Sequence, residues 1–193
     1  MADRSFLILH GFGYDGDPAH WHAWLERSLR ERGERVARPL LPDPERPSLA
    51  AWSEIASSEL EAMAGERIVI AHSLGVLTWI HLSPSLEGPV ERLLLVSPPE
   101  DAEVPAGGEQ FHVGDFDPAP LRASCARAIR LVRGEGDPYS PGGVPPWAEE
   151  AGCEVDAIAG AEHLNPDDGY GEWPSLLAWC EEPGTRITAR VHS

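Results

Sequence analysis

The sequence predicts an α/β protein in which a mostly parallel central sheet carries helices on both faces. Short apolar runs, typical of buried strands, alternate with helix-length segments, and this order is the one that parallel strands require. Turns rich in glycine or polar residues follow several of these runs, where the carboxyl ends of the strands would lie. The length of 193 residues suits one domain spanning residues 1–193.

The first third of the chain contains two strand–helix units. Residues 6–9 form an apolar run that ends in the turn HGFG, and residues 20–33 repeat tryptophan and leucine at helical spacing before a terminal glycine. Residues 35–41 read as a second strand. Ser48 is a suitable N-cap for a helix that runs towards Gly65.

The middle of the chain continues the alternation. Residues 67–71 (RIVIA) read as a buried strand, and the apolar residues 76–80 begin a helix after a short turn. Residues 92–96 (RLLLV) form the next strand. Residues 98–120 are rich in proline, glycine and aspartate, which predicts irregular structure.

The last third of the chain supplies two more strands and a final helix. Residues 128–132 are strand-like and lead into the turn GEGD, and residues 154–158 form the last strand, before the turn GAEH. Residues 173–180 suit a terminal helix. The polar turns after both strands are candidate sites for functional side chains.

Composition excludes several classes of partner and mechanism. Acidic residues outnumber basic ones 32 to 15, and the formal net charge of −17 repels nucleic acid and anionic membrane surfaces. The first apolar run has four residues, too few for a leader or a membrane span. The absence of lysine excludes Schiff-base chemistry. Because the three cysteines form no CxxC pair, we expect a cytoplasmic protein.

Ser73 is the central candidate functional residue, because its motif AHSLG lies between a strand and a helix. Such a turn exposes the serine hydroxyl and needs small neighbours, here Ala71 and Gly75. A serine becomes nucleophilic when a histidine takes its proton and a carboxylate orients that histidine. Asp137 and His163 each follow a later strand, and the order serine, aspartate, histidine is that of the α/β-hydrolase arrangement.

Two backbone amides are candidates for an oxyanion hole. Negative charge develops on the carbonyl oxygen when a serine attacks it, and backbone N–H groups usually stabilise that charge. Leu74 follows the serine at the start of a helix, where N–H groups lack helical partners. Phe12 lies in the HGFG turn after the first strand. We therefore predict Phe12 and Leu74 as the two donors.

Four motifs run nearly from end to end of the chain: HGFGYDGDPAHWHAWL at 10–25, AHSLG at 71–75, GEGDPYSP at 134–141 and GAEHLNPDDGYGEWP at 160–174. On these motifs the chain resembles the small serine hydrolases of the retinoblastoma-binding protein 9 type, which include bacterial YdeN-like proteins. The resemblance implies an α/β-hydrolase fold without a large lid. It also implies Ser73 as nucleophile, Asp137 as orienting acid and His163 as general base.

The sequence departs from this family at two places. Leu164 stands where an aromatic residue often follows the catalytic histidine, and residues 98–125 match poorly. Because the second stretch is expected to overhang the site, substrate preference is not predicted by the resemblance.

Three other aspartates are candidates for the orienting carboxylate, and a second histidine adjoins the serine. An aspartate before a proline often simply begins a turn, so Asp137 has three alternatives as the orienting carboxylate: Asp115, Asp117 and Asp156. His72 adjoins the nucleophile, but we expect its side chain to point away from Ser73 and to pack or hydrogen-bond at the turn.

The HxH pair of His20 and His22 raises the question of a metal. Residues two apart on a helix point apart, and the sequence places no third ligand near them, so we predict no metal site.

These observations together predict a serine hydrolase that needs no metal or organic cofactor. It would cleave a small-molecule ester, thioester or amide through an acyl-enzyme on Ser73. Two alternatives are an acyltransferase with the same triad and a non-catalytic protein-binding module with the same fold. Neither the natural substrate nor a protein partner is predicted.

Overall fold

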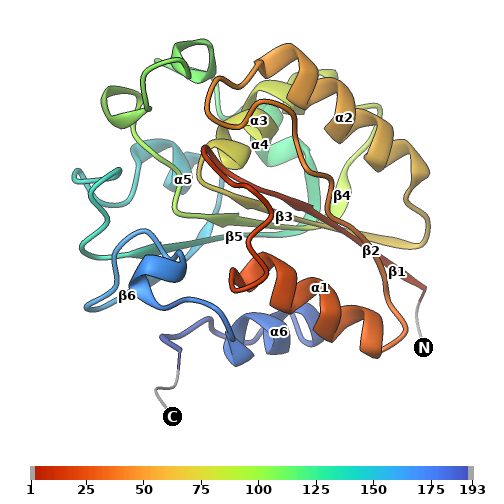
Figure 1. Cartoon of the computed structure of the whole chain (residues 1–193). Coiled ribbons are helices and arrows are strands. Elements are labelled where there is room, and N and C mark those ends of the chain that lie inside the picture. Colours follow the sequence, from red (N-terminus) through yellow and green to blue (C-terminus); the bar gives the residue numbers. More distant parts are fainter. Residues whose placement is uncertain (1–2, 191–193) are drawn as a thin grey trace.

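The computed structural model describes residues 3–190, which form a six-stranded sheet in the order β2-β1-β3-β4-β5-β6 (Figure 1). The strands are β1 (Arg4–Leu9), β2 (Arg35–Ala37), β3 (Glu66–His72), β4 (Val90–Val96), β5 (Cys125–Gly134) and β6 (Glu154–Ile158). Every pair of neighbouring strands is parallel. The predicted parallel sheet is therefore confirmed. Residues 1–2 and 191–193 of the predicted domain lie outside the described residues.

Helices cover both faces of the sheet, as predicted, and no large lid is present among residues 3–190 (Figure 1). One face carries α1 (Trp21–Glu31) and α6 (Pro174–Glu181). The other face carries α2 (Leu49–Ala62), α3 (Leu74–Leu82), α4 (Ala119–Ala123) and α5 (Pro146–Glu150). None of the helices among residues 3–190 combines the length and apolar character that a membrane span would need.

Two apolar cores lie on the two faces of the sheet. In β1, Phe6 and Ile8 pack towards α1 and α6, whereas Leu7 and Leu9 pack towards α2 and α3. Because helices bury both faces, the strands read as continuous apolar runs and not as alternating ones. Buried Arg92 of β4 joins the sheet to α6, since its guanidinium donates hydrogen bonds to the carbonyl oxygens of Trp179 and Cys180 at 3.0 and 2.9 Å.

Three elements differ from the predicted ones. The predicted strand 35–41 ends at Ala37 in the structure, because Pro39 has no N–H to continue the ladder of hydrogen bonds. Strand β5 begins at Cys125 and is longer than the predicted 128–132. The sequence prediction also lacked α5, a helix of five residues that is too short to show periodicity. The irregular stretch 98–120 contains two 3-10 turns and the start of α4.

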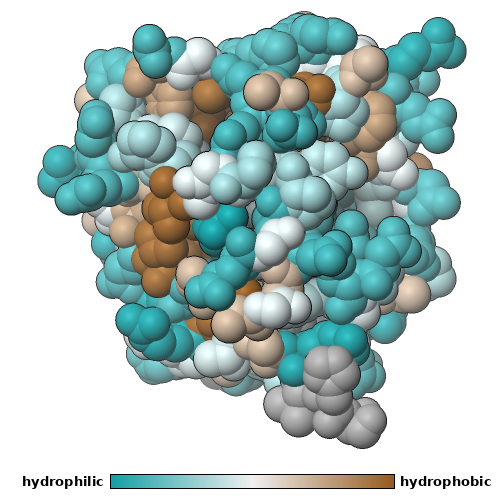
Figure 2. Space-filling view, turned by 90° about the vertical axis from the view of Figure 1, so that its left-hand side faces the viewer, coloured by the Kyte–Doolittle hydropathy of each residue, from teal (hydrophilic) through white to brown (hydrophobic). Residues whose placement is uncertain are grey.

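The carboxyl ends of all six strands meet at one edge of the sheet, which is on the left in Figure 1. Figure 2 looks at that edge and shows a largely hydrophilic surface with one small hydrophobic patch, in keeping with the net charge of −17. The turns that follow β1, β3, β5 and β6 are gathered there, and they carry the residues of the candidate site.

Candidate active site

Ser73 occupies a sharp turn between β3 and α3. Its backbone has φ 53° and ψ −123°, a conformation that residues other than glycine rarely adopt. A Cβ atom on Gly11 would lie 2.6 Å from the Cβ of Ser73, and one on Gly75 would lie 2.7 Å from the carbonyl oxygen of His10. Glycine at both positions therefore lets the turn after β1 and the start of α3 approach the serine closely.

Three predicted residues lie in one hydrogen-bonded chain. The Nε2 atom of His163 lies 2.9 Å from the Oγ of Ser73, and its Nδ1 atom lies 3.0 Å from each carboxylate oxygen of Asp137. Because a carboxylate accepts only, Nδ1 carries a proton and Nε2 presents its lone pair to the serine hydroxyl. The geometry allows His163 to take the proton of Ser73.

Asp137 is held firmly in this chain. It follows β5, its side chain is buried, and its Oδ1 accepts a hydrogen bond of 2.9 Å from the backbone N–H of Tyr139. The ring of Tyr139 also lies against the imidazole of His163, with 4.5 Å between centroids. These contacts fix the orientation of both Asp137 and His163.

The three alternative carboxylates lie elsewhere. Asp156 pairs with Arg130 at 2.7 Å and accepts a hydrogen bond from the N–H of Ile187. Asp117 accepts from the backbone N–H of Ala119, and Asp115 lines a separate cavity between residues 98–101 and 142–147. The carboxylate that contacts His163 is therefore that of Asp137.

A cavity of about 120 Å³ adjoins the Ser73 hydroxyl. The residues that line it are Phe12, Ser73, Leu74, Pro99, Pro105, Tyr139, His163 and Asn165. Both predicted oxyanion donors are among them, and Leu74 is the first residue of α3, so its N–H has no partner within the helix. Pro99 and Pro105 come from the stretch 98–125, which contributes one wall of this cavity.

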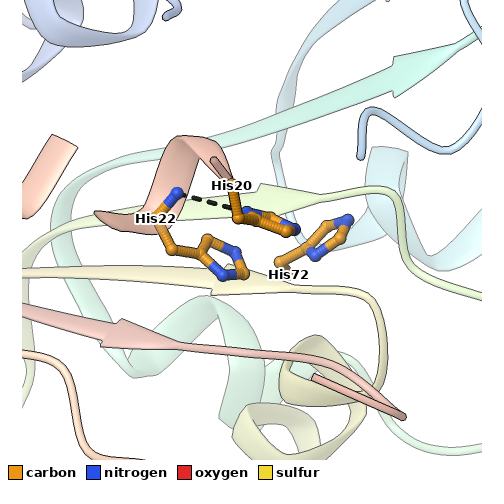
Figure 3. Close-up of side chains that lie close together, drawn as sticks. All are labelled: His20, His22 and His72. Atoms are coloured by element: carbon orange, nitrogen blue, oxygen red, sulfur yellow. Dashed lines mark hydrogen bonds between the residues drawn. The ribbon is translucent and has the colours of Figure 1, made fainter. Parts of the chain in front are cut away.

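A second cavity, of about 290 Å³, is also lined by Ser73. Its lining includes His20, His22 and His72, whose side chains lie close together in Figure 3. The expectation that His20 and His22 point apart, with no third histidine nearby, is wrong. His20 is the N-cap of α1 with extended backbone (φ −66°, ψ 143°), so helical geometry does not separate the two rings, which stack with centroids 3.8 Å apart. His72, at the end of β3, lies 5.2 Å from the ring of His22.

Burial keeps these imidazoles neutral. Loss of solvent lowers the pKa of His20 to about 3 and lowers the pKa of His22 and of His72 well below the usual range. His72 donates from Nε2 to the carbonyl oxygen of His163 at 3.1 Å, so this residue hydrogen-bonds at the turn, as expected. The bond links the residue before the serine to the backbone of the histidine loop.

His10 supports the same region, although the sequence analysis gave it no role. Its Nδ1 donates to the carbonyl oxygen of Gly11 at 2.8 Å, and its Nε2 accepts from the N–H of Leu41 at 2.8 Å. Burial lowers the pKa of His10 to about 4, which keeps the ring in this neutral tautomer. His10 thereby holds the glycine turn against the chain that leaves β2.

The parallel sheet and the position of Ser73 after β3, Asp137 after β5 and His163 after β6 define an α/β-hydrolase. The model of the serine hydrolase family matches residues 6–181, so the chain belongs to this family, as the sequence resemblance implied.

Solved structures with the same fold include two YdeN-like proteins. The ydeN gene product from B. subtilis is 19% identical with a TM-score of 0.78, and the match covers 93% of this chain and 97% of the other. A putative YdeN-like hydrolase from Pectobacterium atrosepticum is 22% identical with a TM-score of 0.71, covering 93% and 90%.

A third solved structure also has a similar fold. Est1E from Butyrivibrio proteoclasticus, solved with ferulic acid bound, is 15% identical with a TM-score of 0.61, covering 84% of this chain and 82% of the other. No curated protein matches the sequence significantly.

Proposed function

We propose that this protein hydrolyses a small ester, thioester or amide through an acyl-enzyme on Ser73. The observation that carries the proposal is the continuous hydrogen-bonded chain from the Ser73 hydroxyl through His163 to Asp137, with distances of 2.9 and 3.0 Å. Membership of the serine hydrolase family supports hydrolysis in general.

In the acylation step, the Oγ atom of Ser73 attacks the substrate carbonyl while its proton passes to Nε2 of His163. Asp137 accepts the hydrogen bond from Nδ1 and stabilises the imidazolium that forms. The imidazolium then protonates the leaving group, which departs as an alcohol, thiol or amine. The acyl group is left as an ester of Ser73.

Deacylation repeats the same steps with water as the nucleophile. His163 takes a proton from water, the resulting hydroxide attacks the acyl ester, and the proton returns to the Oγ of Ser73. In both steps the amides of Phe12 and Leu74 would hold the negatively charged oxygen of the tetrahedral intermediate. Loss of one such donor typically costs about 100- to 1000-fold in kcat.

The size of the cavity beside Ser73 favours short acyl groups. A cavity of about 150 Å³ holds one benzene molecule, so the cavity of about 120 Å³ here would take an acyl chain of roughly four or five carbon atoms. Its walls combine proline, leucine and aromatic rings with the polar side chains of Ser73, His163 and Asn165. We expect p-nitrophenyl acetate and butyrate to be cleaved faster than the octanoate.

A fluorophosphonate probe tests the nucleophile directly. The wild-type protein should take up one probe molecule, seen as one adduct in the intact mass, and Ser73→Ala should take up none. Ser97→Ala is the matched control, because Ser97 is a buried serine with positive φ at the end of neighbouring β4. Equal labelling of Ser73→Ala and wild type, or no labelling of wild type, would overturn the proposal.

Analysis of the acyl products distinguishes hydrolysis from acyl transfer, which would use the same three residues. With p-nitrophenyl butyrate and added butanol, hydrolysis gives butyrate as the main product. Butyl butyrate as the main product would contradict the choice of water as the acceptor.

A further inference from the structure

We propose that His20, His22 and His72, here called the histidine cluster, form a binding site for a divalent cation of the Zn²⁺ type. Each residue offers one ring nitrogen, and these three nitrogens lie within 4.8 Å of one another (Figure 3). Imidazole nitrogen is a preferred ligand of Zn²⁺, Co²⁺ and Ni²⁺. Among residues 3–190 the cluster is the one group of histidine, cysteine and acidic side chains with such an arrangement.

His22 gives an independent reason to expect a ligand. Its side chain is fully buried, and neither ring nitrogen has a hydrogen-bond partner within the described part of the chain. Buried polar atoms are nearly always paired, because an unpaired one loses its bonds to water without compensation. His22 also lines the cavity of about 290 Å³ beside Ser73. A cation in that cavity would supply a partner for one of the two ring nitrogens.

The hydrogen bonds of His72 leave the correct nitrogen free. Its Nε2 faces the carbonyl oxygen of His163 at 3.1 Å, and because a carbonyl only accepts, Nε2 carries the proton. The lone pair is then on Nδ1. A ligating histidine typically donates its other N–H to a backbone carbonyl in this way, which fixes both tautomer and ring orientation.

Binding requires a small local rearrangement. Ligand nitrogens around tetrahedral Zn²⁺ lie about 3.3 Å apart, so the three rings must rotate inward from their present separations of up to 4.8 Å. The Nδ1 atom of His20 now accepts a hydrogen bond of 3.2 Å from the backbone N–H of His22. A cation bound at Nε2 of His20 would require the ring proton to lie on Nδ1. This hydrogen bond at the N-cap would then be lost. The fourth position would open into the cavity, whose lining includes Asp15, Asp17 and Asp167.

The binding test uses untagged protein and CoCl₂ or ZnCl₂ alone. Isothermal titration should give one ion per chain, and Co²⁺ should produce the intense visible absorption of a tetrahedral complex. His22→Gln should weaken binding by at least about 100-fold, since loss of a residue that only orients a ligand already costs 10- to 100-fold. His112→Gln, which removes an exposed histidine, should leave the affinity unchanged.

Two further variants make the outcome decisive. Ser73→Ala should bind Co²⁺ as wild type does, so failure of the proposed hydrolase function leaves the metal proposal intact. His20→Gln provides a second ligand variant in case His22→Gln does not fold, as judged by thermal melting. Absence of stoichiometric binding by wild type, or wild-type affinity in a folded ligand variant, would overturn the proposal.

Discussion

Replacement of Asp137 by asparagine should invert the tautomer of His163. The backbone N–H of Tyr139 donates to Oδ1 at 2.9 Å, so the oxygen of the introduced amide must stay at that position. The amide NH₂ then takes the place of Oδ2, which lies 3.0 Å from Nδ1 of His163. Nδ1 lies equally close to Oδ1, at 3.0 Å, but an N–H there would oppose the donating NH₂, so the tautomer that accepts at Nδ1 and carries the ring proton on Nε2 is favoured. His163 then faces the Ser73 hydroxyl with an N–H and cannot take its proton.

The expected loss is about 10⁴-fold in kcat, the size seen when a triad aspartate is changed in this way, or about 5.4 kcal/mol at about 1.36 kcal/mol per factor of ten. The KM should change little, because Asp137 lines neither cavity beside Ser73. The assay is the kcat for p-nitrophenyl butyrate between pH 6 and 9.

Asp117→Asn is the matched control, since an amide oxygen can still accept the N–H of Ala119 and the residue lies away from His163. A kcat for Asp137→Asn within tenfold of wild type would refute the tautomer reasoning. Equal losses in Asp137→Asn and Asp117→Asn would refute it as well.

Two predictions concern stability. The folded-state pKa values of His10 and His20, about 4 and about 3, lie below the unfolded value near 6.5. The unfolded chain therefore binds more protons as the pH falls below 6.5, and each histidine should lower the free energy of unfolding by up to about 1.4 kcal/mol per pH unit. Urea unfolding from pH 8 to 4 measures this, and a flat profile below pH 6.5 contradicts it. Gly134→Ala should destabilise by about 1–3 kcal/mol or more, because its Cβ would overlap the carbonyl oxygen of Glu162. Gly88→Ala, which has open space for a Cβ, should change the melting temperature little, and equal effects of the two substitutions would refute the steric argument.

Much of the fold was predictable because its signals are local. Buried parallel strands are short apolar runs, and each one ends in a turn with its own glycine or polar signature. The position of Ser73, Asp137 and His163 after strands brought them to one edge of the sheet, as expected. Their roles in catalysis stay a prediction that the proposed substitutions test.

The remaining features depend on contacts between distant segments. The stacking of His20 on His22 depends on a cap residue leaving the helix, and His72 joins them only after β1 and β3 pair. Periodicity carries no information about either event. The proton positions on His10 and His72 likewise follow from carbonyl and amide groups that the fold supplies.

The strained backbone of Ser73, the proposed nucleophile, lowers the stability of the folded protein. At φ 53° a residue with a Cβ pays a steric penalty on the order of 1 kcal/mol or more, which glycine would escape. An inert chain with glycine at this turn should therefore melt at a higher temperature than the natural one. Stability alone would therefore favour glycine at this position, whereas the proposed reaction requires the serine hydroxyl, as expected where activity depends on a strained site.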